Sequence, residues 1–148
     1  MATPPGSDSI SAEEIKHLEL IQAVVTRLAN GSFLIKGWTM TVAGIFFGIA
    51  ANNLSWKIAT TGMIPIIGFW LLDSYYLRQE RLFRKLYDDV RKPNVPVEAF
   101  SMNIAAYHQQ EPWRKVITSH TMVNFYGTLF LVASTFAVGA AIIEAQGN

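Results

Sequence analysis

The sequence predicts an all-α membrane protein with three transmembrane helices, an N-terminal amphipathic helix and a cytoplasmic helical extension. Of its 148 residues, 51% are hydrophobic and only 16% are charged, whereas soluble domains average about 25% charged residues. Three nearly uncharged runs approach the ~20 residues needed to cross the hydrocarbon of a bilayer. The core of a soluble helical domain is the alternative, but a chain of this length could not bury three such runs.

The first helix is expected to follow a disordered tail. Residues 1–10 are rich in Pro, Gly and Ser and lack the apolar side chains that order a segment. Residues 11–148 are expected to form a single helical membrane domain. Ser11 and Glu14 have the spacing of a capping box, which begins a helix. The amphipathic helix is expected to end near Ala29, because the following Asn-Gly pair tolerates the left-handed conformation common at helix ends.

The three spans are expected near residues 33–52, 57–76 and 121–143. Lys36 is the one charge in the first span, and its long side chain is expected to reach the membrane surface beside Trp38. Pro65 lies in the middle of the second span, where it removes a backbone hydrogen bond and is expected to kink the helix.

The second span is expected to continue into water as a basic helix. The segment 69–91, FWLLDSYYLRQERLFRKLYDDVR, passes from apolar residues through Asp73 and two tyrosines into a run of basic residues. Tyrosine favours this boundary because its ring is apolar and its hydroxyl is wet. The cytoplasmic helical segment 77–115 is expected to include a short helix near residues 97–107 and a restart at Pro112, a suitable first helical residue.

An apolar seam on this extension is expected to pack against the N-terminal helix, which carries a matching stripe at Leu18, Val25 and Leu28. The two helices together would form a cytoplasmic stalk. The seam residues proposed to carry a signal are Phe83, Leu86 and Val90.

Charge predicts the orientation. Eight of the twelve Lys and Arg residues lie between residues 78 and 115, and basic residues near spans stay cytoplasmic. The N-terminus is therefore expected in the cytoplasm and the C-terminus outside. The N-terminus lacks the basic and apolar regions of a cleaved signal peptide.

No pattern of catalytic or metal-binding residues is found. His17, His108 and His120 lack the spacing of metal ligands, and the Asp88-Asp89 pair is typical of a solvated helix face. We therefore expect no enzyme, no catalytic, cofactor-binding or metal site, and no cofactor. The net charge of +1 gives no electrostatic basis for binding nucleic acid.

Small residues recur at four-residue spacing in two spans, which lets helix backbones approach closely. They could pack within the monomer or between subunits, so that a homo-oligomer is expected on the second interpretation. The candidate packing residues are Gly44, Gly48, Ala133, Ala137 and Ala141.

Four polar residues fall within one arc of the third span at about 100° per residue. A hydrogen-bonded seam is one interpretation, since threonine can bond its own backbone, and the lining of a pore is the other. The stripe residues are Thr121, Asn124, Thr128 and Thr135.

The N-terminal helix, the tight two-span hairpin and the basic helix leaving the second span, over residues 12–92, resemble small bacterial membrane proteins of the SLATT-like class. The resemblance implies a membrane-permeabilising effector of antiviral (antiphage) defence in the bacterial inner (plasma) membrane. The first hypothesis is a homo-oligomeric effector or channel-like protein gated through its cytoplasmic helices by a protein partner. The second is a non-conducting anchor or accessory subunit for a cytoplasmic enzyme. The third span departs from a two-span effector.

Overall fold

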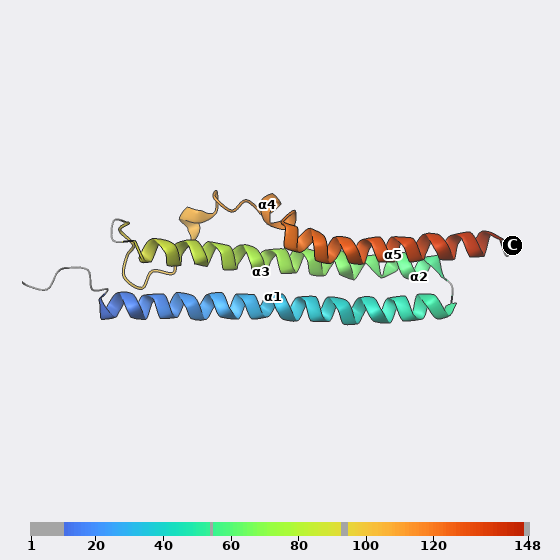
Figure 1. Cartoon of the computed structure of the whole chain (residues 1–148), viewed down its shortest axis with the longest axis horizontal. Helices are drawn as coiled ribbons and strands as arrows, with labels where there is room; N and C mark the ends of the chain where they lie inside the picture. The colour runs from blue at the N-terminus through green and yellow to red at the C-terminus, as the bar shows by residue number, and fades with distance from the viewer. Residues whose placement is uncertain (1–10, 54, 93–94, 147–148) are drawn as a thin grey trace, which may run out of the picture.

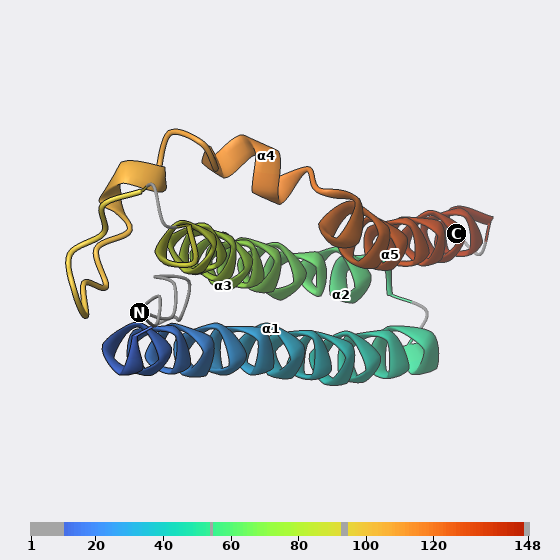
Figure 2. The same cartoon turned by 60° about the vertical axis from the view of Figure 1, so that its left-hand side comes forward.

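Three long helices dominate the computed structural model, which describes residues 11–53, 55–92 and 95–146. They are α1 (Ala12–Asn53), α3 (Met63–Val90) and α5 (His120–Gln146), joined by the shorter α2 (Trp56–Thr61), η1 (Ala105–Tyr107) and α4 (Trp113–Ile117). In both views the line formed by α2 and α3 lies between α1 and α5 (Figures 1 and 2). By length and composition, α1, the α2–α3 pair and α5 can each cross a membrane.

The first helix is longer than the sequence predicts. The capping box is confirmed, because the Ser11 amide donates to a Glu14 carboxylate oxygen at 2.8 Å and the Glu14 amide donates to Ser11 Oγ at 3.1 Å. From there α1 runs for 42 residues, about 63 Å at 1.5 Å per residue. The expected end near Ala29 is wrong, and the amphipathic helix is the first half of α1 rather than an element of its own.

Packing against α3 explains why the helix continues through Gly31. A Cβ atom at this position would lie 2.5 Å from a ring carbon of Tyr76, so glycine admits the tyrosine ring between the two helices. The close contact between α1 and α3 therefore requires a residue without a side chain at position 31. This contact outweighs the weak tendency of Asn-Gly to end a helix.

The second span is interrupted at Gly62, between α2 and α3. Pro65 follows within the first turn of α3, where a missing amide costs little because the first amides of a helix have no partner within it. The Gly62 amide donates to the Ile58 carbonyl at 3.0 Å. A Cβ atom at Gly62 would lie 2.8 Å from Cβ of Phe46, so the interruption also lets α1 approach closely.

The segment after α3 is less helical than expected. The helix ends at Val90, and between residues 97 and 107 only the 3₁₀ turn η1 forms. Phe100 adopts a φ of 60°, which no right-handed helix accommodates. Pro112 does precede a helix, but α4 has only five residues and ends before α5 begins. The expected helix near residues 97–107 is therefore wrong except for η1, whereas the restart at Pro112 is confirmed.

Three apolar clusters follow one another along the α2–α3 line. The first belongs to the stalk, the second to the region where α1, α3 and α5 meet, and the third to the far end of the spans, where small residues bring α1, α2 and α5 together. Their buried members are Ile21, Val25, Leu82, Leu86 and Tyr107; Ala43, Ile66, Met122 and Tyr126; and Ala50, Ala59 and Ala137.

Candidate functional site

A buried carboxylate lies where the three spans meet. Asp73 of α3 has no exposed surface, and Lys36 Nζ of α1 lies 2.6 Å from its Oδ2 atom. Ser32, one turn before Lys36, donates a hydrogen bond to Oδ1. The hydroxyl of Tyr126 on α5 donates to Oδ2 at 3.1 Å. One side chain of α3 therefore contacts polar groups of both other spans.

These four residues form a compensated polar centre. Lys36 also donates to Ser32 Oγ at 2.8 Å, so that the ammonium and the hydroxyl are both oriented toward the carboxylate. Tyr126 is held by Trp70, whose ring is stacked on it with centroids 5.8 Å apart. A buried carboxylate is costly unless it is paired and hydrogen-bonded, and Asp73 receives one cation and two hydroxyl donors. We call Ser32, Lys36, Asp73 and Tyr126 the junction centre.

This centre was not predicted from the sequence. Lys36 was expected to reach the membrane surface beside Trp38, but it turns inward to Asp73, whereas Trp38 points outward and is 62% exposed. A signal was present: Lys36 is the fourth residue of the first expected span, and Asp73 is the fourth from the end of the second. In an antiparallel hairpin, these opposite charges come to the same depth.

The predicted stalk forms, with partly different residues. Leu86 is fully buried against Ile21 and Val25 of α1, and Phe83 and Val90 are partly buried beside them. Leu18 and Leu28, predicted for the facing stripe, are only half-buried. Ile21, which was not among the predicted stripe residues, is fully buried in the cluster.

Residues after α3 cover the stalk. Tyr107 is buried in the stalk cluster, and its hydroxyl donates to Asp89 Oδ2 at 2.9 Å. Burial, and secondly the bond to Asp89, raise the pKa of Tyr107 to about 12. The hydrogen bond from Lys92 is the main cause that lowers the pKa of Asp89, and Tyr107 contributes to the same effect. A hydrogen bond from the neutral phenol of Tyr107 to the ionised carboxylate of Asp89 therefore holds the segment after α3 against the stalk.

The predicted small residues divide into two sets. Ala133 and Ala137 are buried within the chain, and Ala141 is half-buried. Gly44 and Gly48 have open space where a side chain would be. Packing within the chain therefore does not explain the Gly-x-x-x-Gly pair, which lies on the side of α1 opposite the α3 contact.

An open groove of about 1080 Å³ continues along α1 into the stalk. Its walls are mostly apolar, and the polar side chains of Glu19 and Arg27 also line it. Tyr76 and Tyr87 of α3 form the other wall, so the groove lies on the α3 side of α1. The apolar residues of the groove include Ile15, Leu18, Leu34, Tyr76 and Tyr87.

The polar stripe faces outward on α5, away from the buried Met122, Tyr126 and Ala133. All four of its members, Thr121, Asn124, Thr128 and Thr135, are exposed. Their hydrogen bonds stay within α5: Thr128 donates to the Asn124 carbonyl at 2.6 Å and Thr135 to the Leu131 carbonyl at 2.9 Å. The Asn124 amide lies 3.2 Å from Nδ1 of His120.

Comparisons with known proteins found no matching family model, no similar curated protein and no similar solved structure. Among the described residues, no group of three or more His, Cys, Asp or Glu side chains could hold a metal ion.

Proposed function

We propose that this protein is a homo-oligomeric, channel-like membrane effector in which a cytoplasmic stalk controls the packing of the spans. The continuity of α1 and α3 is the observation that carries the proposal. Both helices pass from the stalk into the membrane region, α1 without a break and α3 down to Gly62. A displacement of the stalk therefore moves two spans, and the junction centre couples that movement to the third through Tyr126.

Two unlike outer faces support assembly into an oligomer. The glycine face lies on α1, and the polar stripe lies on α5, on the other side of the α2–α3 line (Figure 2). Faces of different kinds on opposite sides produce head-to-tail contacts, which close into a ring when the rotation allows. Exposed polar groups in hydrocarbon favour contact with another helix or with water. A pathway for solutes would then lie between subunits.

The proposed orientation puts the stalk in the cytoplasm and the end of α5 outside, in the inner (plasma) membrane of a bacterium. The basic residues of the α3 extension and of the segment after it support this orientation. Reporter fusions at residues 3, 95 and 148 test it. A cytoplasmic reporter at residue 148 would refute the topology.

Permeability itself is tested by dye release from liposomes that contain the purified protein. Thr128→Val together with Thr135→Val removes two hydroxyls of the stripe with little change in shape, and we expect it to reduce release. Thr60→Val with Thr61→Val is the matched control, because these threonines also bond to carbonyls of their own helix, at 3.0 Å and 2.8 Å, but lie on α2. Equal dye release from both double variants would show that the polar stripe does not line a pathway for solutes.

The anchor hypothesis remains the second candidate, and one observation favours it. The stripe threonines already bond to carbonyls of α5, so their hydroxyls need neither water nor a neighbouring helix. An anchor would release no dye, and a cytoplasmic protein would copurify with it through the stalk and the segment after α3. A link to antiphage defence follows only from the resemblance of residues 12–92, and growth arrest on overexpression would support it.

A further inference from the structure

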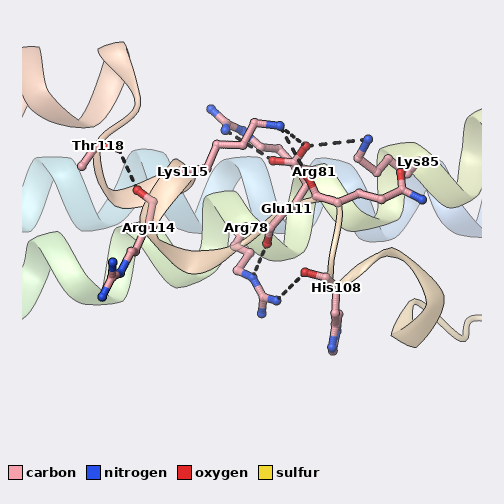
Figure 3. Close-up of polar contacts among 9 residues, drawn as sticks. Arg78, Arg81, Lys85, His108, Glu111, Arg114, Lys115 and Thr118 are labelled. Atoms are coloured by element: carbon pink, nitrogen blue, oxygen red, sulfur yellow. Dashed lines mark hydrogen bonds and ion pairs between the residues drawn. The ribbon is translucent and has the colours of Figure 1, made fainter.

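Basic side chains gather around Glu111, between α3 and α4. Its carboxylate lies 2.9 Å from Lys115 Nζ and 3.7 Å from both Arg81 and Lys85. Figure 3 shows these three cations converging on the one acidic group from two elements. On the other side of the same segment, Arg78 Nε donates to the Glu111 backbone carbonyl at 2.8 Å. The side chain brings together residues that lie up to 34 positions apart, Arg81 and Lys115.

The cluster carries excess positive charge. Three cations lie within 4 Å of a single carboxylate, and the bonds of Arg78 to backbone carbonyls neutralise none of its charge. The nearby Glu80 is paired with Arg84 at 2.6 Å. Since like charges at this spacing repel one another, a second anion among the three cations would lower the electrostatic energy.

Glu111 is nevertheless well suited to organise the cations. Glu111 is buried, and one of its carboxylate oxygens makes no hydrogen bond with any of the described residues. Burial alone would raise the pKa of Glu111, but the hydrogen bond and charge of Lys115, with the charges of Lys85 and Arg81, lower it overall. The carboxylate therefore remains ionised and holds the three side chains in place without balancing them.

Aromatic residues place this cluster beside the membrane surface. Trp113 lies next to Tyr75 with ring centroids 6.3 Å apart, and Trp70 Nε1 donates to the Ile117 carbonyl at 3.3 Å. Tryptophan and tyrosine favour the level of the lipid headgroups. Lys115 follows two residues after Trp113, and its side chain is 56% exposed, so that its ammonium can reach a headgroup.

We propose that Arg81, Lys85 and Lys115 bind the phosphate of an anionic phospholipid in the leaflet that faces the stalk. Lysine acts on phosphate as a point charge and arginine as a fork of donors, and basic pockets of this kind beside spans bind anionic headgroups. Tyr75, about 9 Å from Arg81 along α3 at 1.5 Å per residue, and its neighbour Trp113 favour a lipid over a free phosphate ion. The proposal goes beyond the effector function and holds whether or not the protein conducts.

Native mass spectrometry of the full chain, titrated with phosphatidylglycerol or phosphatidylcholine in detergent, tests the site. We expect preferential retention of phosphatidylglycerol. Arg81→Gln, Lys85→Gln and Lys115→Gln combined should reduce that preference about a hundredfold, at about fivefold per cation. The matched control, Lys16→Gln, Arg91→Gln and Lys92→Gln combined, removes equal charge from exposed positions outside the cluster and should leave the preference unchanged.

Glu111→Gln separates lipid binding from a purely structural role. Removal of the competing carboxylate should strengthen phosphatidylglycerol binding about fivefold, whereas a cluster that only holds the segment in place would gain nothing. Circular dichroism and elution volume show whether each variant is folded. Equal loss in both triple variants, no gain in Glu111→Gln, or complete displacement of the lipid by inorganic phosphate would overturn the proposal.

Discussion

The junction centre gives the sharpest test of how the spans are held together. Lys36→Met keeps most of the side-chain volume but leaves the Asp73 carboxylate buried without a cation, although Ser32 and Tyr126 still donate to it. Removing one partner of a buried ion pair costs about 3–5 kcal/mol. We expect a loss of this size in the free energy of unfolding.

Asp73→Asn should lower the free energy of unfolding by less, about 1.5–3 kcal/mol, which is the range for a hydrogen bond to a charged group. The reason is the geometry of Lys36, whose side chain is 22% exposed and can turn its ammonium toward the membrane surface once the carboxylate is gone. Lys36→Met combined with Asp73→Asn should lower the free energy of unfolding by about 1–3 kcal/mol less than the sum of the two single losses, because the two side chains contact each other directly.

Equilibrium unfolding in mixed micelles measures these differences. Tryptophan fluorescence is a suitable signal, since Trp70 lies against Tyr126 of the centre. Lys57→Met is the matched control, because Lys57 is an exposed lysine of the second span with no ion pair among the described residues, and it should change the free energy by less than about 0.5 kcal/mol. Additive single effects, or equal losses in Lys36→Met and Lys57→Met, would refute the reasoning.

Three further predictions concern the outer face and the stalk. Gly44→Leu with Gly48→Leu should lower the number of subunits seen in native mass spectrometry. The unfolding free energy of each chain should stay within about 0.5 kcal/mol of the wild-type value, because both positions face open space. An unchanged oligomer would contradict this prediction. Phe83→Asp should abolish dye release without preventing insertion, since it puts a charge into the stalk cluster; normal release from an inserted variant would show that the stalk carries no signal. The pKa of Tyr107 is about 12 in the folded protein, above its usual value of 10. Its hydrogen bond to Asp89 should therefore stabilise the segment after α3 fully below pH 10, and this contribution should disappear as the pH rises toward 12. Tyrosinate absorbance during alkaline titration should therefore lose a late step in Tyr107→Phe, and an identical titration curve would argue against the contact.

Local patterns were sufficient wherever a structure depends on neighbours in the chain. The capping box at Ser11 needs only two residues three positions apart, and three long apolar runs predict three helices able to span a membrane because the bilayer sets their length. The pairing of the extension with the N-terminal helix could also be predicted, since both carried an apolar stripe and their charge predicted the same side of the membrane for both. The end of the first helix could not, because it depended on Tyr76, 45 positions away from Gly31.

Only the tertiary structure decided which polar residues meet. By sequence, Lys36 was an interfacial lysine and Asp73 a residue at the edge of its span, and each assignment was reasonable for a helix alone. Packing α1 against α3 brought their charges within 2.6 Å of each other and gave the carboxylate a third partner on α5. The same applies to Glu111, which collects cations from α3 and α4. Periodicity shows which side of a helix a residue occupies, but the free energy of burying a charge depends on what the neighbouring helix offers at that depth.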